Sequence, residues 1–163
     1  WRSIGNIDEE FLNNVLDTNL KGVFWGCKSA LSVMQAGANI VNVSSIAGKR
    51  GSSNNSAYCS SKFAVNAVTQ SLAKEVGKQN IRVNAVCPVI VPTEGLIEAL
   101  DEPESPAYGN IDGFIDNFRK TQAALPELPT GEEIGKACLF LASDDASAVT
   151  GQCINVDCGV FPQ

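Results

Sequence analysis

The chain has 163 residues, of which 44% are hydrophobic, and this length and composition suit one domain with a hydrophobic core. Its formal net charge of −6 argues against a nucleic-acid partner, because phosphate binding requires clustered Lys and Arg. The sequence shows neither an apolar stretch near the ~20 residues of a membrane span nor a signal-peptide pattern. We therefore expect a single domain over residues 1–163 in the cytoplasm, without a membrane or nucleic-acid partner.

The cysteines do not form a metal-binding pattern. None of the six is part of a Cys-x-x-Cys pair, and the chain has no histidine. Zinc sites draw on paired cysteines or on histidines, and disulfide frameworks are typical of small secreted domains. The sequence therefore predicts no metal site and reduced thiols that pack as small apolar side chains. The six are Cys27, Cys59, Cys87, Cys138, Cys153 and Cys158.

The first predicted element is a long helix over residues 8–34. Asp8 is a good N-cap, and two acidic residues follow it in the first turn, where the helix dipole favours them. Apolar residues then recur at helical spacing from Phe11 to Met34. The next segment, ANIVNVSS over residues 38–45, predicts a fully buried strand of a parallel sheet.

A second long helix is predicted over residues 56–77, where Gly77 is positioned to end it. The segment IRVNAVCPVIV over residues 81–91 predicts a second buried strand, which ends at Pro88 because proline cannot continue a central hydrogen-bond ladder. The expected inner face of the helix comprises Ala57, Phe63, Ala64, Ala67, Val68, Leu72 and Val76.

Residues 92–130 differ in character, because they are rich in proline and acidic residues. They contain two short predicted helices, over residues 95–100 and 111–124. A capped helix over residues 131–143 and a last short strand within residues 151–159 complete the chain. The alternation of helices with buried strands predicts an α/β fold with a parallel sheet.

The stretch over residues 44–65 combines features of an active site. Tyr58 and Lys62 are four residues apart and so share one face of the predicted helix. Tyrosine, with a pKa of about 10, is a poor base at neutral pH, and a neighbouring Lys cation lowers that pKa. Ser45 follows the carboxyl end of a strand, where ligands bind in open α/β sheets. Each residue alone is more often a cap, a core side chain or a surface group, but together they predict a catalytic proton relay.

Several motifs, in order along the chain, make the sequence resemble the short-chain dehydrogenase/reductase family. They are NLKGVF with Asn19, IVNVSSIAG with Ser45, YCSSK with Tyr58 and Lys62, IRVNAVCPVIVPT, and FLASDDASAVTGQCINVDCG. The resemblance covers nearly the whole chain and implies a Rossmann-like, doubly wound parallel sheet. It also implies that the family's N-terminal dinucleotide-binding half, with its glycine-rich phosphate loop, is absent from this sequence, which then corresponds to the C-terminal part only.

The resemblance implies an NAD(P)-dependent oxidoreductase that interconverts a secondary alcohol and a ketone by hydride transfer. The choice between NAD and NADP stays open, because the strand end that makes it is not in the sequence. In this family Asn19 would hold a water that links Lys62 to solvent, and Ser45 would bind the substrate oxygen. The implied catalytic residues are Asn19, Ser45, Tyr58 and Lys62, and the implied cofactor-binding residues are Tyr58, Lys62, Pro88, Val91 and Thr93.

One position departs from the family pattern. The family usually has Pro-Gly where this chain has Pro88 and Val89. Valine cannot adopt the backbone conformations that glycine can, and its side chain would crowd the nicotinamide end. We therefore expect a changed cofactor pose or a changed substrate shape.

Residues 92–130 resemble the family's substrate-binding loop, and a connection of this length is uncommon unless it is functional. The functional interpretation is a lid that shields the nicotinamide and selects the substrate. The alternative is a variable surface flap. The acidic residues argue against an anionic substrate, unless Arg119 or Lys120 faces inward.

The two long predicted helices have wide apolar faces. In the family they pack against a second subunit as a four-helix bundle, and the C-terminal INVDCGVFPQ resembles another subunit contact. The resemblance thus implies a homodimer or a homotetramer.

Three functions stay open from the sequence. The first is the oxidoreductase, acting on a small-molecule alcohol or ketone. The second is a truncated or non-catalytic scaffold or partner chain, which the absent phosphate loop favours and the matched relay residues disfavour. The third is an enzyme that uses the same site for epimerisation or dehydration.

Overall fold

Three parallel strands in the order β1-β2-β3 form the centre of the structure, a computed structural model in which residues 1–162 are described. The strands are β1 (Asn39–Val43), β2 (Arg82–Pro88) and β3 (Cys153–Val156). Ile40 lies beside Val83 in one ladder, and Val86 lies beside Ile154 in the other. The predicted α/β fold with a parallel sheet is confirmed.

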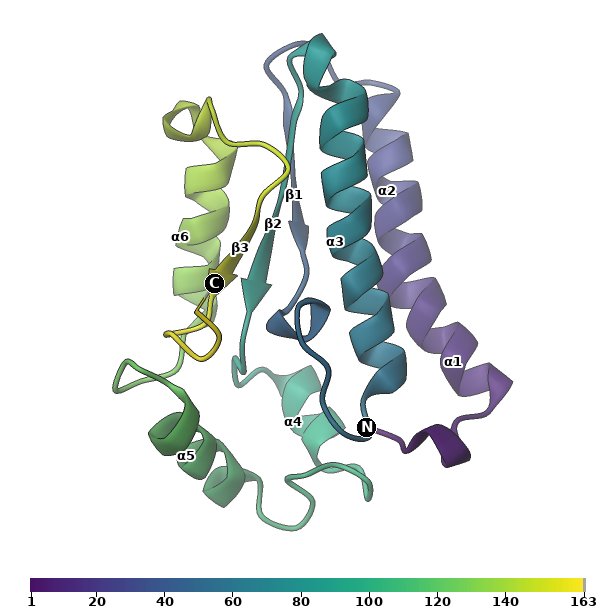
Figure 1. The fold of residues 1–163 in the computed structure, drawn as a ribbon, viewed down its shortest axis with the longest axis vertical. Coiled ribbons are helices and arrows are strands. Elements are labelled where there is room, and N and C mark those ends of the chain that lie inside the picture. Colours follow the sequence, from purple (N-terminus) through teal and green to yellow (C-terminus); the bar gives the residue numbers. More distant parts are fainter. Residues whose placement is uncertain (163) are drawn as a thin grey trace.

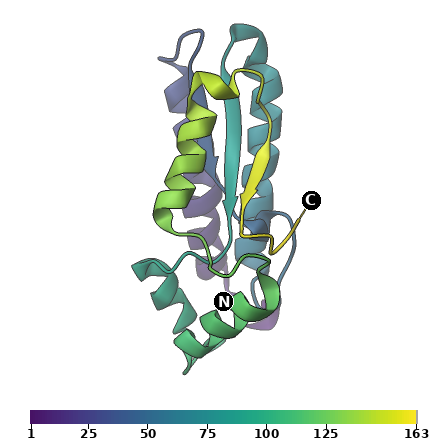
Figure 2. The same ribbon diagram turned by 90° about the vertical axis from the view of Figure 1, so that its left-hand side faces the viewer.

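Helices cover both faces of this sheet. The helix α3 (Ser56–Val76) packs on β2 with α2 (Gly22–Leu31) beside it, and α6 (Gly131–Ala142) packs on β1 and β2 from the opposite side (Figure 1). The helices α4 (Glu94–Leu100) and α5 (Ile111–Gln122) lie beyond the carboxyl ends of the strands (Figures 1 and 2). Covering on both faces is the arrangement of a doubly wound sheet, which leaves its carboxyl edge open for a site.

The first long helix is interrupted and ends earlier than predicted. Asp8 caps α1 (Glu9–Leu16) by accepting a hydrogen bond from the backbone N–H of Phe11. A π-helical segment, η2 (Asp17–Lys21), then leads into α2, which ends at Leu31 and not at residue 34. Single π-helical turns are rare and frequently mark functional sites. The predicted helix therefore holds a feature that apolar spacing alone does not reveal.

Only β2 is a buried strand of the kind predicted. Residues Val83 to Cys87 of β2 are buried, whereas Val43 at the end of β1 is 54% exposed and all of β3 is half-buried. The reason is topological, because β2 has a strand on each side while β1 and β3 each have one. A short apolar run in the sequence does not distinguish a central strand from an edge strand.

The inner face of α3 differs from the predicted apolar face. Phe63, expected to be inside, is 46% exposed, while polar Ser61 and Thr69 are completely buried. Thr69 is satisfied locally, since its hydroxyl donates to the backbone oxygen of Val65 at 2.9 Å and accepts from Asn42 Nδ2 at 2.9 Å. Buried polar groups are tolerated when they are hydrogen-bonded in this way. Of the predicted apolar face of α3, Phe63 and Ala67 are exposed, while Ala57 and Val76 are buried.

The ends of the later helices agree with the sequence in most places. Thr130 and Glu133 form a capping box at the start of α6. After α3, however, Gly77 keeps a helical backbone and begins a short 3-10 turn, and the left-handed residue that turns the chain is Asn80, with φ 58°. Asparagine tolerates this conformation better than most residues, so it serves the role predicted for glycine.

The described part of the chain holds no helix long and apolar enough to cross a membrane. All six cysteines are free thiols. Within residues 1–162, no three or more His, Cys, Asp or Glu side chains are grouped to hold a metal ion.

Candidate active site

A cavity of about 630 Å³ lies at the carboxyl ends of the strands, where ligands bind in open α/β sheets. Both Ser45 and Tyr58 line it. The remaining walls come from α1, from the loop after β2, and from α4 and α5. The structure thus brings two of the four predicted catalytic residues to one open space.

Ser45 is held at the junction of two strands. It follows β1 and caps the short 3-10 turn η3 (Ile46–Gly48), where its hydroxyl accepts a hydrogen bond from the backbone N–H of Ala47 at 3.1 Å. The same hydroxyl lies 3.5 Å from the backbone oxygen of Pro88 at the end of β2. These contacts aim the Ser45 hydroxyl along the carboxyl edge of the sheet.

A close approach between η3 and α3 places Ser45 near Tyr58. A Cβ atom at position 48 would lie only 2.6 Å from the backbone oxygen of Lys62. Asn66 Nδ2 donates to the backbone oxygen of Gly48 at 2.9 Å, and Ser44 Oγ donates to that of Lys62 at 3.2 Å. We did not predict a role for Gly48, Asn66 or Ser44 from the sequence. The feature of the sequence that could have indicated this close approach is the glycine three residues after Ser45.

Tyr58 and Lys62 lie one turn apart on α3, as predicted. The Lys62 Nζ is 5.7 Å from the centroid of the Tyr58 ring and donates a hydrogen bond to the backbone oxygen of Val43 at 3.1 Å. Tyr58 reaches the cavity, whereas Lys62 is not among the residues that line it. Lys62 therefore lies behind Tyr58, at the end of β1.

The pKa of Tyr58 departs from the sequence-based expectation. Burial raises this pKa, and a hydrogen bond with the Ser45 hydroxyl opposes the rise. Lys62, whose own pKa is lowered by burial, is not among the causes of the Tyr58 shift. The prediction that Lys62 lowers the pKa of Tyr58 is therefore not met here. Instead, the neutral phenol is favoured at neutral pH.

Asn19 is linked to the active-site helix through a serine. It lies in the π-helical segment η2, and its Nδ2 donates to Ser61 Oγ at 3.2 Å. Ser61 Oγ in turn donates to the backbone oxygen of Tyr58 at 2.7 Å. Ser61 is fully buried and directly precedes Lys62, so Asn19 contacts α3 between the two predicted relay residues. We did not predict a role for Ser61 from the sequence.

Three predicted cofactor-binding residues at and after the end of β2 are not among the residues that line the cavity: Pro88, Val91 and Thr93. Pro88 is the last residue of β2, and Thr93 caps α4 by accepting a hydrogen bond from the backbone N–H of Leu96 at 3.3 Å. Val89 and Ile90, which lie between them, line the cavity. Val91 is half-buried beside them. Val89, which stands where the family usually has glycine, thus lines the cavity.

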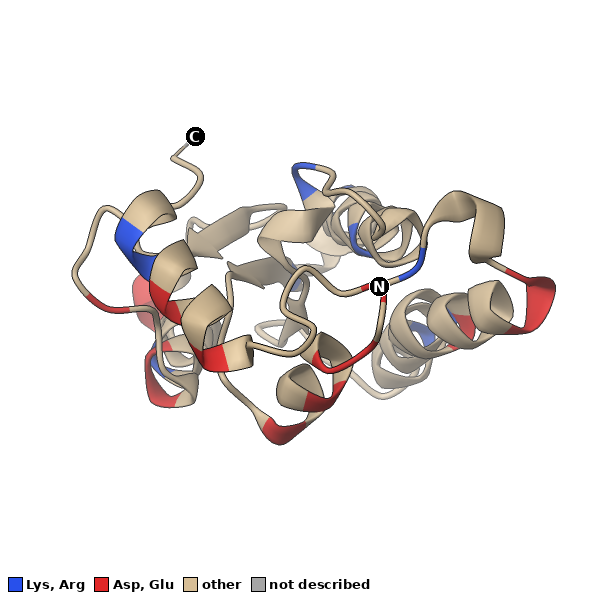
Figure 3. Cartoon of the chain, turned by 90° about the horizontal axis from the view of Figure 1, so that it is seen from below, with Lys and Arg blue, Asp and Glu red and all other residues tan. Residues whose placement is uncertain are grey.

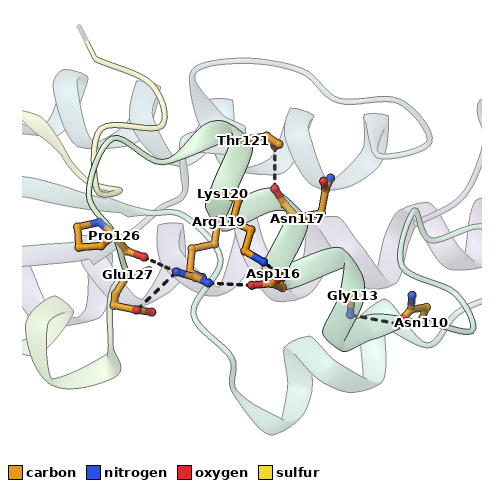
Figure 4. A network of polar contacts seen from close by, with 9 residues as sticks. All are labelled: Asn110, Gly113, Asp116, Asn117, Arg119, Lys120, Thr121, Pro126 and Glu127. Carbon is orange, nitrogen blue, oxygen red and sulfur yellow. Dashed lines mark hydrogen bonds and ion pairs between the residues drawn. The ribbon is translucent and has the colours of Figure 1, made fainter.

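Arg119 and Lys120 form ion pairs with acidic residues of their own segment. Arg119 contacts Asp116 at 2.8 Å and Glu127 at 3.5 Å, and Lys120 contacts Asp116 at 2.6 Å (Figure 4). Asp116 keeps a lowered pKa for this reason, chiefly through the hydrogen bond from Lys120. Neither cation lines the cavity. Arg119 and Lys120 are therefore not placed to bind an anionic substrate there.

One carboxylate ties the 92–130 segment to the start of the chain. Glu104 accepts hydrogen bonds from the backbone N–H of Ser3 at 2.8 Å and from Asn6 Nδ2 at 2.9 Å. The backbone oxygen of Glu104 also accepts from Asn54 Nδ2 at 3.4 Å, in the serine-rich loop before α3. We call these contacts the Glu104 clasp. It joins three segments that all contribute walls to the cavity.

Comparisons with known proteins agree with this geometry. A family model described as Enoyl-(Acyl carrier protein) reductase matches residues 2–161. The chain is 35% identical over 160 residues to a 3-oxoacyl-(acyl-carrier-protein) reductase of Chlamydia muridarum, covering 94% of this chain and 58% of that protein. It is 39% identical over 157 residues to a 3alpha-hydroxysteroid dehydrogenase of Mediterraneibacter gnavus, covering 95% of this chain and 58% of that protein.

Solved structures with a similar fold are also dehydrogenases or reductases. A short-chain dehydrogenase/reductase from Brucella melitensis has a TM-score of 0.86 and 30% identity, covering 99% of this chain and 61% of that one. An aldohexose dehydrogenase from Thermoplasma acidophilum has a TM-score of 0.88 and 28% identity, covering 100% and 67%.

The curated relatives are longer than this chain, which spans 58% of each of the two described above. The family model nevertheless covers almost every residue, and the matching structures reproduce the sheet and the helices on both of its faces. The chain therefore belongs to the short-chain dehydrogenase/reductase family.

Proposed function

We propose that this chain carries the catalytic centre of an NAD(P)-dependent oxidoreductase that interconverts a secondary alcohol and a ketone. The observation that carries the proposal is the placing of Ser45 and Tyr58 on one cavity at the carboxyl edge of the sheet. Lys62 stands behind Tyr58, and Asn19 reaches the same turn of α3 through Ser61. A scaffold has no need of such a set, which disfavours the non-catalytic alternative.

In the proposed mechanism Tyr58 is the general acid for ketone reduction. Its raised pKa keeps the phenol protonated at neutral pH, so that it can donate a proton to the substrate oxygen. The Ser45 hydroxyl donates a hydrogen bond to the same oxygen and stabilises its developing charge. The Ser45 hydroxyl, whose hydrogen bond lowers the Tyr58 pKa, then stabilises the phenolate that remains until solvent returns a proton to it. Alcohol oxidation reverses each step.

The nicotinamide cofactor, when bound, supplies or accepts the hydride. The donor set suits its ribose, because the Lys62 ammonium has three N–H groups and directs one of them at the Val43 oxygen. We propose that Tyr58 and Lys62 contact the ribose hydroxyls, and that Pro88, Val91 and Thr93 hold the nicotinamide amide. A structure of a 4-hydroxyisoleucine dehydrogenase with NADH, at TM-score 0.77 and 25% identity, supports this class of cofactor without choosing between NAD and NADP here.

We also propose that the protein acts on a small molecule as a homodimer or homotetramer in the cytoplasm. The outer faces of α2 and α3 support the subunit contact. Phe24, Trp25 and Phe63 there are 49%, 54% and 46% exposed, which is unusual for large aromatic side chains of a monomer surface.

The test is the exchange Tyr58→Phe in the whole protein, assayed in both directions with NADH and NADPH. We expect turnover to fall by a factor on the order of 10³, because a general acid is removed. The matched control is Tyr108→Phe, which alters a tyrosine that is 59% exposed and does not line the cavity. Unchanged turnover in Tyr58→Phe would sink the proposal.

The same assay separates the alternatives. A folded wild-type protein that turns over no alcohol or ketone with either cofactor would support the scaffold. Conversion of a substrate without net change in the cofactor would support epimerisation or dehydration.

A further inference from the structure

The cavity has two walls of different chemistry. The polar wall comes from the loop between β1 and α3 and from the first turn of α3. Its uncharged polar members are Ser45, Ser52, Asn54, Asn55 and Tyr58, and it also holds Arg50 and three apolar residues, Ile46, Ala47 and Ala57. The start of the chain and α1 complete the lining with Trp1, Arg2, Phe11 and Val15. The opposite wall comes from the loop after β2, from α4 and from α5. Its members are mostly apolar, and include Val89, Ile90, Leu96, Ala99, Phe114 and Phe118.

Phe114 and Phe118 form the aromatic part of the apolar wall. They are four residues apart on α5, so they face the same way, and their ring centroids lie 6.1 Å apart. Both rings are only half-buried. None of the charged residues of α5 lines the cavity, and Arg119 and Lys120 each pair with Asp116 (Figure 4). The helix α5 thus presents its aromatic side chains, and not its charges, to the open space.

The polar wall offers few free partners beyond Ser45 and Tyr58. Asn54 Nδ2 donates to the backbone oxygen of Glu104 at 3.4 Å, and Asn55 Nδ2 donates to Ser52 Oγ at 3.3 Å. A sugar or polyol needs a hydrogen-bond partner for each hydroxyl that it buries. The wall from the loop after β2, α4 and α5 adds only one polar side chain to the described lining, that of Glu102.

The cations on the lining are engaged with aromatic rings. The Arg2 guanidinium lies 4.3 Å from the ring centroid of Phe11 and 3.9 Å from the Asp8 carboxylate. The Arg50 guanidinium lies 5.4 Å from the ring centroid of Phe161. The surrounding surface is acidic at many points, as the view from this end of the molecule shows (Figure 3). The acidic surroundings, and not the aromatic contacts of these two cations, weigh against an anionic substrate.

We infer that the substrate is a large, mainly apolar ketone or secondary alcohol, whose oxygen lies at Ser45 and Tyr58 and whose apolar body lies against Phe114 and Phe118. This inference rests on the proposed function. The cavity of about 630 Å³ is within the size range of sites that enclose drug-sized ligands, and under the proposed function it admits the nicotinamide end of the cofactor as well as the substrate. Among the activities that relatives carry, the inference excludes small diketones and sugars as the preferred substrates.

The first test is a homologous series of methyl ketones from four to twelve carbons, assayed with the whole protein. Each methylene buried against the apolar wall should raise kcat/KM about threefold to fourfold until the cavity is filled. A hexose and a hexitol should be much poorer substrates than the long ketones. A flat series, or a preference for the hexose or hexitol, would overturn the inference while leaving the oxidoreductase proposal intact.

The second test changes the aromatic wall. Phe118→Ala should raise KM for the ten-carbon ketone at least roughly tenfold while kcat/KM for the four-carbon ketone changes little. The control is Tyr108→Ala, which removes an exposed aromatic ring from the same 92–130 segment and should leave both ketones unaffected. Equal losses on long and short ketones would show a structural effect on the site and would contradict the assignment.

A third measurement does not depend on turnover. Millimolar 2-decanol should raise the melting temperature of the wild-type protein by mass action, and the same concentration of a hexitol should not. Phe118→Ala should remove the rise. Binding of 2-decanol without any turnover would refute the proposed function and keep the apolar site, whereas turnover without this selective binding would refute the apolar site.

Discussion

Gly48 and Lys62 are in contact in a way that no other residue at position 48 would allow. A Cβ atom there would lie 2.6 Å from the Lys62 backbone oxygen and 2.8 Å from Asn66 Nδ2. This contact presses the turn that follows Ser45 against the helix that carries Tyr58 and Lys62. Gly48 thus influences the distance between the Ser45 and Tyr58 hydroxyls, the proposed catalytic groups, without a proposed role of its own in the chemistry.

Replacing this glycine should damage stability and activity together. Gly48→Ala must push η3 away from α3, and we expect it to lower the free energy of unfolding by about 1–3 kcal/mol and to reduce kcat. Gly51→Ala is the control, because no atom lies within 4 Å of a Cβ built at that position of the same loop. Denaturant titration and steady-state kinetics measure the two effects. Equal stability of the two variants would show that the contact is not tight.

The pKa of Tyr58 sets the pH dependence of the proposed reaction. Because burial raises this pKa, the phenol stays protonated through neutral pH, so ketone reduction should hold there and decline only at alkaline pH. Alcohol oxidation needs the phenolate and should rise with pH over the same alkaline range. The Ser45 hydroxyl lowers the Tyr58 pKa. Ser45→Ala should therefore move the pH profiles of both ketone reduction and alcohol oxidation to higher pH. Initial rates of both reactions, measured across pH, test this expectation. A shift of the profiles to lower pH in Ser45→Ala would contradict the assignment of Tyr58 as the titrating group.

The Glu104 clasp should restrain the cavity's outer wall. Its hydrogen bonds to Asn6 and Ser3 lower the pKa of Glu104, so the clasp is complete above the ordinary carboxyl pKa and is lost as the pH falls through the lowered value. Glu104→Ala should speed amide hydrogen exchange severalfold in residues 101–108 and raise KM, with less effect on kcat. Glu98→Ala, an exposed acid on α4, is the control. Unchanged exchange in Glu104→Ala would mean that the clasp does not hold this segment.

The backbone at Cys158 is strained, and replacing this residue by glycine should stabilise the protein. Its φ of 53° is left-handed, and its backbone oxygen accepts hydrogen bonds from the N–H groups of Ala124 and Leu125 at 2.9 and 3.1 Å, so the turn cannot relax freely. Cys158→Gly should raise the free energy of unfolding by about 0.5–1 kcal/mol. Cys158→Ala removes the thiol but keeps the strained backbone, and should give no gain in a urea titration. A gain from alanine equal to that from glycine would assign the effect to the thiol.

The sequence was sufficient for features that depend on neighbouring residues. Asp8 and Thr130 cap helices where predicted, β2 ends at Pro88, and Tyr58 and Lys62 fall one turn apart. Caps, breakers and helical spacing act over a few residues, so they can be read along the chain. The alternation of predicted helices and strands along the chain likewise indicated the parallel sheet.

Tertiary structure decided what depends on distant atoms. Which face of α3 is buried follows from the sheet and η3 packed against it, and so Phe63 is exposed while Ser61 is buried. The contact of Asn19 with Ser61 spans 42 residues, and that of Gly48 with Lys62 joins two elements.

The pKa of Tyr58 shows the same division most clearly. Its spacing from Lys62 predicted a lowered value, because the sequence shows a cation nearby and cannot show burial. In the folded chain desolvation outweighs the opposing hydrogen bond from Ser45 and raises the value. The sequence by itself thus determined the spacing of Tyr58 and Lys62 along one helix. The tertiary structure decided that Ser45 and Tyr58 share the cavity and that the Tyr58 pKa is raised, because desolvation depends on all the atoms that fold around the phenol.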